Sequence, residues 1–158
     1  FVILHVKISN MFKKIIFLLG LCLPFLATAQ EDTTVLILDD LQFDVQSVET
    51  SGDTAIINLF VISLTRQQRE FKMNTYASTV VDKKENDHMY TQIQMGRVSI
   101  DLEDRQNYLN YLLSMDQPSS LKFRVAGWKK ENGPPQAVKV VFEDSREPGR
   151  FRQIRVKL

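Results

Sequence analysis

The side chains that most often carry catalysis or bind zinc are scarce in this chain. The 158-residue sequence has two histidines and one cysteine. We expect the N-terminal segment that holds His5 and Cys22 to be removed, for reasons given below, which leaves His88 alone. Neither a Gly-x-Ser-x-Gly elbow nor a His-Glu-x-x-His pair is present, and zinc prefers nitrogen and sulfur ligands. We therefore predict a turn histidine, no catalytic residue, no metal and no cofactor.

Carboxylates are more plentiful, and they gather in three short stretches. These are Asp39-Asp40, then Asp82, Glu85 and Asp87, then Asp101, Glu103 and Asp104. Paired carboxylates hydrolyse glycosides only across a defined separation. The 82–87 stretch also lacks the ligand spacing and the glycine of a known calcium loop. The pattern favours solvated charges in turns.

Three amphipathic aromatic residues are the candidate ligand-binding residues: Tyr108, Tyr111 and Trp128. Exposed together, they would stack on sugar rings or anchor a protein partner. The alternative is core packing, because a domain of this size usually buries much of its tryptophan. Their grouping on one exposed face would favour glycans, and their burial would favour protein contacts.

The last segment, 146–158, holds five basic residues and one acidic residue. Its alternating pattern predicts a terminal strand that carries Arg152, Arg155 and Lys157. These side chains could meet an anionic surface polymer. They could instead protect an open strand edge from aggregation.

The N-terminal part has the pattern of an export signal. Met11 is followed by Lys13-Lys14, the apolar run IIFLLGLCLPFL and Ala27-Thr28-Ala29, which gives small residues at both cleavage positions. The run is too short for a membrane span. We expect residues 1–10 to be a non-native upstream extension, 11–29 a signal peptide and 30–158 the mature domain, which is periplasmic or secreted and has no transmembrane segment.

The mature part is expected to form one domain of 129 residues. Removal of three lysines leaves 17 basic and 19 acidic residues, a net charge of −2. It has no cysteine, so its stability must come from packing and not from disulfides. Its charge gives no sign of nucleic-acid binding.

The core is expected to centre on residues 54–64, TAIINLFVISL. Both faces of this strand are apolar: Ile56, Phe60, Ile62 and Leu64 share one parity, and Ala55, Ile57, Leu59 and Val61 share the other. A sandwich strand normally has one wet face. We therefore expect a cover over Ile57, Leu59 and Val61. It is either a short helix within 101–114, using Leu109, Leu112 and Leu113, or an interaction partner.

Alternating residues in several other segments predict further strands. The segments 41–46, 89–95, 121–126 and 138–142 each show this pattern, and the turn Ser51-Gly52-Asp53 joins two strands as an antiparallel hairpin. We expect an all-β antiparallel sandwich of about seven or eight strands, with one short helix as an option.

The order of these segments resembles small secreted bacterial immunoglobulin-like domains of unknown function. The resemblance rests on Leu41-x-Phe43-x-Val45, the Gly52 turn, the 56–62 strand, the Asp82-led turn before Tyr90, and Pro118 before Leu121-x-Phe123-x-Val125. It implies an immunoglobulin-like fold and carries no catalytic motif.

These patterns together predict a non-enzymatic binding or assembly module of the bacterial cell envelope. Its expected partner is another envelope protein or a surface polymer. Two alternatives stay open at this point: a carbohydrate-binding or carbohydrate-active protein, and a structural accessory subunit of a surface complex.

Overall fold

The computed structural model describes residues 36–158. Twelve strands and two 3-10 turns make up this part of the chain. The strands are β1 (Leu36–Leu38), β2 (Leu41–Ser51), β3 (Thr54–Ser63), β4 (Arg69–Asn74), β5 (Thr79–Val81), β6 (Asp87–His88), β7 (Gln92–Met95), β8 (Val98–Asp101), β9 (Tyr108–Leu113), β10 (Ser119–Ala126), β11 (Ala137–Glu143) and β12 (Phe151–Lys157); the 3-10 turns are η1 (Leu102–Asp104) and η2 (Lys130–Asn132). The predicted upstream extension and signal peptide lie outside the described residues.

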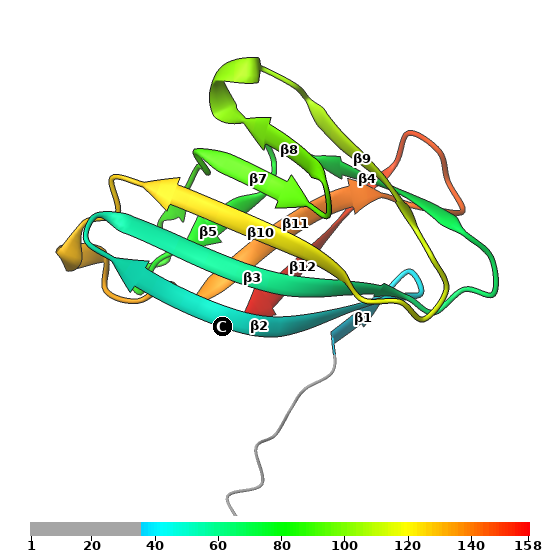
Figure 1. The fold of residues 1–158 in the computed structure, drawn as a ribbon, viewed down its shortest axis with the longest axis horizontal. Coiled ribbons are helices and arrows are strands. Elements are labelled where there is room, and N and C mark those ends of the chain that lie inside the picture. Colours follow the sequence, from blue (N-terminus) through cyan, green and yellow to red (C-terminus); the bar gives the residue numbers. More distant parts are fainter. Residues whose placement is uncertain (1–35) are drawn as a thin grey trace, which may run out of the picture. The chain divides into compact units, whose positions relative to one another are not determined.

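The strands form two antiparallel sheets (Figure 1). One has the order β1-β2-β3-β10-β7-β8. The other has the order β6-β5-β11-β4-β9, in which β5 and β4 pair with opposite ends of one edge of β11; β12 pairs along the other edge of β11. The all-β prediction is confirmed. The count of seven or eight strands was too low, because β1, β5 and β6 have only two or three residues each, too few to show alternation. Within residues 36–158, no helix is long and apolar enough to cross a membrane.

The hairpin of β2 and β3 is confirmed. The turn at its tip contains Gly52, whose φ of 61° lies in the left-handed region that glycine adopts without strain. Leu41 pairs with Ser63 at one end of the ladder and Ser51 with Thr54 at the other. A β-bulge interrupts the register of β2 between Val45 and Ser47.

The expected cover over one face of β3 is present within the chain, but the second sheet supplies it and not a helix. Ile57, Leu59 and Val61 have 0% exposure and form part of the core, so they are not an interaction surface. Pairing with β10 determines which face of β3 is buried, because Leu121 pairs with Leu59 and Phe123 with Ile57. The alternation of β10 is unambiguous, and pairing in register puts both sets of side chains on one face.

The other parity of β3 faces outward, and polar neighbours flank it. Phe60 lies opposite Asp44 of β2, and Ile56 lies opposite Arg124 of β10. Phe60 and Ile56 are half-buried. Long polar side chains cover apolar surface with their stems, so this face needs no helix over it.

The expected helix within 101–114 does not form. Leu102–Asp104 make a single 3-10 turn, and Tyr108–Leu113 form the edge strand β9. Leu109 and Leu113 are buried, whereas Leu112 is 58% exposed. Leucines at 109, 112 and 113 fit a helical spacing, but 109 and 113 also share one face of a strand, and that face packs in the core.

Candidate functional site

A cleft of about 450 Å³ opens at one end of the two sheets. The lining of one wall comes from the segment between β3 and β4 and the start of β4, and that of the other from the end of β11 and the β11–β12 loop. Figure 1 shows these segments at the same end of the sheets. Nine of its ten lining residues are polar or charged: Thr65, Gln67, Gln68, Arg69, Glu70, Lys72, Glu143, Asp144 and Ser145, with Pro148 as the tenth. Its volume lies in the range of small-molecule sites.

A buried ion pair supports this cleft. Arg69, the first residue of β4, donates to both the backbone oxygen and the carboxylate of Asp39. Only 6% of the Arg69 side chain and 1% of the Asp39 side chain are exposed. From the opposite wall, the backbone N–H and the hydroxyl of Ser145 donate to the Asp39 carboxylate over 2.9 and 2.7 Å. Asp39 therefore holds the two walls together.

Asp39 keeps its negative charge in this environment. Burial raises the pKa of its carboxyl group, but the hydrogen bonds from Ser145 and the hydrogen bond and charge of Arg69 outweigh burial and hold the pKa below its usual value. The expectation of a solvated turn charge was wrong for this residue. Its partners come from distant segments, so sequence spacing gave no sign of them.

The β11–β12 loop is fixed by its own acidic residues. The Asp144 carboxylate accepts a 2.9 Å hydrogen bond from the Arg146 backbone N–H and a further bond from Arg152. The Glu143 carboxylate accepts from the Gly149 backbone N–H over 2.7 Å. These backbone bonds are the largest causes that lower the pKa of Asp144 and of Glu143. The loop wall of the cleft is thus held in one shape.

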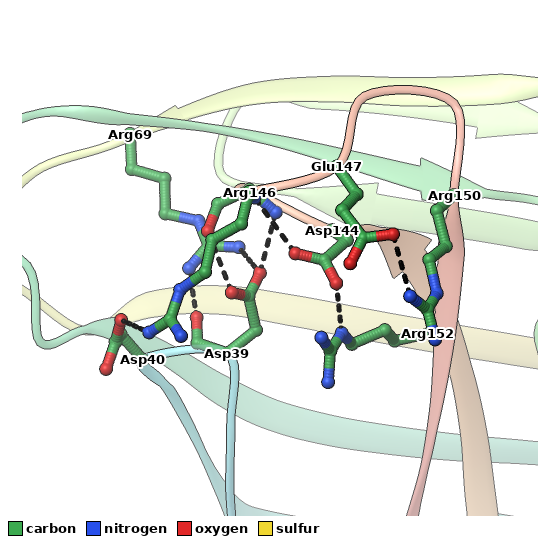
Figure 2. A network of polar contacts seen from close by, with 9 residues as sticks. Asp39, Asp40, Arg69, Asp144, Arg146, Glu147, Arg150 and Arg152 are labelled. Atoms are coloured by element: carbon green, nitrogen blue, oxygen red, sulfur yellow. Dashed lines mark hydrogen bonds and ion pairs between the residues drawn. The ribbon is translucent and has the colours of Figure 1, made fainter.

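Two further ion pairs of this network lie on the surface. Arg146 donates to Asp40 over 3.3 Å, and Arg150 donates to Glu147 over 2.7 Å (Figure 2). At least half of each of these four side chains is exposed. Exposed pairs of this kind contribute little to stability.

One donor of Arg69 has no partner. Its Nε–H is buried and forms no hydrogen bond, although both terminal nitrogens bind Asp39. Such a buried orphan donor costs free energy. Arg69 is also one of the residues that line the cleft.

An aromatic pair lies beside the cleft. Tyr108 and Phe151 stack with centroids 5.7 Å apart and an interplanar angle of 13°. Lys72, which lines the cleft, places its ammonium group 4.7 Å from the Tyr108 centroid and 3.3 Å from Glu143. Tyr108 is 39% exposed. Of the three predicted aromatic ligand residues, Tyr108 alone lies near this site.

The other two aromatic candidates point elsewhere, so the three share no common surface. Tyr111 is on the opposite face of β9, packs against the core, and its ring lies where a side chain at Gly96 would be. Trp128 is 4% exposed and donates from Nε1 to the Gly133 oxygen over 2.8 Å. Alternation separates Tyr108 from Tyr111, and Trp128 comes from the opposite end of the sheets.

Trp128 belongs to a second polar cluster, which contains His88. Their ring centroids are 4.7 Å apart, and the His88 Nε2 lies 2.9 Å from the Asp82 carboxylate. Asp82 also accepts from the backbone N–H groups of Lys84 and Asn86. Burial raises the pKa of Asp82, but the bonds from His88, Asn86 and Lys84 lower it far more. Asp82 is thus another buried carboxylate that was expected to be solvated, and it organises the 82–87 turn.

The predicted basic strand is β12; among residues 36–158 it pairs with β11 alone, which leaves its other edge without a strand from this part of the chain. Arg155 and Lys157 are exposed, and Arg152 is half-buried. Arg152 binds Asp144, and Arg155 binds Glu85 over 2.7 Å. Two of the three basic side chains are therefore neutralised within the chain.

The cleft offers hydrogen bonding, not an evident reaction centre. Its lining within residues 36–158 contains no histidine or cysteine, and of its three carboxylates Glu143 and Asp144 are held by neighbouring donors, whereas Glu70 is exposed. Among residues 36–158, no three histidine, cysteine or acidic side chains are grouped as metal ligands would be. Comparison with known proteins finds no matching family model, no similar curated protein and no similar solved structure.

Proposed function

We propose that this protein is an exported, non-enzymatic binding module of the bacterial cell envelope. The cleft between the β3–β4 segment and the β11–β12 loop is its binding site. The observation that carries this proposal is the cleft itself, a half-open hollow of about 450 Å³ lined mostly by polar residues, whose walls are tied together through Asp39 and Ser145. A preformed cleft lowers the cost of ordering the site on binding.

The placement of His88 supports a role without catalysis. His88 lies on β6, which pairs with β5, and β5 pairs with Ala137–Lys139 at the start of β11. The cleft lies at the other end of β11, at Glu143 and Asp144. Far from the cleft, the His88 imidazole contacts the Asp82 carboxylate and the Trp128 ring. It therefore serves the packing of the 82–87 turn.

Export and fold family are parts of the same proposal. Export rests on the pattern of residues 11–29. The proposal of an immunoglobulin-like domain is supported by two antiparallel sheets with a shared core, one of which pairs β3 with the distant strand β10. Such domains serve most often as binding modules on cell surfaces, and this analogy rests on fold alone.

Site-directed photocrosslinking in the native envelope tests the proposal. A photoreactive residue at Gln68 lies exposed at the cleft, and one at Lys130 of η2 is exposed at the opposite end of the sheets. We expect irradiation to produce a defined crosslinked species from position 68 and none from position 130. Position 130 is the control for non-specific crosslinking.

Two results would contradict the proposal. Crosslinking from position 130 with none from position 68 would move the binding surface to the other end. Recovery of the protein in the cytoplasmic fraction, with residues 11–29 still attached, would exclude an envelope role.

A further inference from the structure

We infer that the cleft binds an uncharged saccharide chain, and this inference rests on the proposal that the cleft is a binding site. Three independent features of the cleft favour this ligand over a charged or an apolar one. They are the hydrogen-bonding groups on its walls, the internal neutralisation of its charges and the aromatic pair beside it.

The exposed lining groups match the chemistry of hydroxyls. Gln67, Gln68 and Glu70 are exposed at the cleft. Each amide both donates and accepts hydrogen bonds, and a carboxylate accepts several. A sugar hydroxyl also donates and accepts, so neighbouring hydroxyls of one ring can bind a carboxylate and an amide together. An apolar ligand would leave these groups unsatisfied, which costs free energy.

The charges of the lining are largely neutralised before any ligand binds. Arg69 is paired with Asp39, Lys72 with Glu143, and Asp144 with Arg152. Among residues 36–158, Glu70 is the one charged lining residue that forms no ion pair with another side chain. An anionic ligand would therefore have to displace a carboxylate from Arg69 or Lys72. A neutral ligand meets no such competition.

The stacked pair of Tyr108 and Phe151 adds aromatic surface next to the polar wall, part of which the Lys72 ammonium group covers. Lys72 joins the two, because it lines the cleft and places its ammonium group against both rings, 4.7 and 5.8 Å from their centroids. Tyr108 remains 39% exposed. The faces of a sugar ring carry C–H groups that pack on aromatic rings, while its edge carries hydroxyls. A saccharide chain therefore fits a polar cleft with an adjoining aromatic surface.

A titration of the purified protein with defined oligosaccharides tests this inference. The neutral probes are the trisaccharides cellotriose, xylotriose, maltotriose, laminaritriose, mannotriose and N-acetylated chitotriose, and the acidic probe is trigalacturonate. Each is added at millimolar concentration and followed by calorimetry and by amide chemical shifts. We expect at least one neutral probe to bind saturably, with shifts at cleft residues and little change in affinity with added salt.

A pair of matched variants locates the binding. The double variant Gln68→Ala/Glu70→Ala removes two exposed polar groups of the cleft, and Gln46→Ala/Glu49→Ala removes the same residue types from exposed positions of β2. We expect the first variant to weaken binding about tenfold or more, as the loss of two hydrogen bonds predicts. The second variant should bind like the unaltered protein.

Each contrary result has a clear meaning. Absence of binding by every neutral probe, unchanged binding by the cleft variant, or salt-sensitive binding of trigalacturonate alone would overturn the saccharide inference. If position 68 still crosslinks to an envelope protein while all neutral probes fail, the saccharide inference is wrong and the binding-module proposal stands. If position 68 yields no crosslink to protein while a neutral probe binds the cleft, the ligand is the saccharide itself.

Discussion

Asp39 and Arg69 form a buried ion pair although 30 residues separate them in the chain. One side chain precedes β2 and the other begins β4, so the pair locks the ends of two sheets together. The attraction between buried charges offsets their desolvation only while both partners are present. The pair is therefore sensitive to any single substitution.

Replacement of Asp39 by Asn should destabilise the protein strongly. The change leaves the Arg69 guanidinium buried without a counter-charge and weakens the bonds from Ser145. Loss of one partner of a buried pair costs about 3 to 5 kcal/mol. Urea unfolding followed by circular dichroism measures it. The control Arg146→Gln removes an exposed pair with Asp40 and should cost less than about 1 kcal/mol. Equal effects of the two changes would contradict the buried role of Asp39.

Acid should destabilise the protein through the carboxylates with lowered pKa values. Asp39, Asp82 and Asp144 each have a folded-state pKa below the ordinary 3.8. Their contribution to stability is therefore fully present above about pH 4 and is lost as the pH falls through the folded-state values. The urea midpoint should be lower at about pH 3 than at about pH 6.

The variant Asp82→Asn is the internal control for this pH effect. The amide at position 82 does not take up a proton in this pH range. The urea midpoint of the variant should therefore be lower than that of the unaltered protein at about pH 6, and it should fall less between about pH 6 and about pH 3. An acid-induced fall of the same size in the variant would show that Asp82 does not contribute to it.

Neighbouring substitutions in β3 test which face is inside. Leu59 is fully buried. Leu59→Ala should lower the free energy of unfolding by about 3 kcal/mol, because the change leaves a cavity in the core. Phe60 faces outward and is half-buried, so Phe60→Thr should cost roughly 1 kcal/mol. The free energy of unfolding gives both values. A larger cost at Phe60 than at Leu59 would reverse the assignment of the faces.

Export processing is expected to remove residues 11–29. The intact mass of the exported protein should match a chain that begins at Gln30, because Ala27 and Ala29 supply small residues at the cleavage positions. Replacement of Ala29 by a bulky residue such as Phe should slow cleavage. Exported protein that retains the apolar run before Pro24 would contradict this prediction.

Fold class followed from the sequence, because alternation and turn residues are local signals. The β2–β3 hairpin and the strand at 121–126 were found this way. The face of β3 that packs in the core was not, since both parities of that strand are apolar. Pairing with Leu121 and Phe123 decides it, and strand pairing between distant segments is not visible in local periodicity.

The cleft was harder to predict than the fold. Its walls come from residues near 65–72 and near 143–148, which the second sheet brings together. Asp39 looked like a solvated turn residue because its partners Arg69 and Ser145 lie 30 and 106 residues away. The weak signal was an acidic pair directly before a strand, at a turn where Asp39 and Asp40 both have positive φ.

The connection between β3 and β10 has a consequence for the order of folding. Thr54 pairs with Ala126 and Val61 with Ser119, so β3 lacks one of its two neighbours until β10 has been synthesised. Ladders between such distant segments form slowly, because the entropy of closing a long loop must be overcome first. A nascent chain of this topology stays without a closed core until most of it has left the ribosome. That delay keeps the chain extended for longer, a state compatible with passage through a narrow translocation channel, as the export that we propose requires.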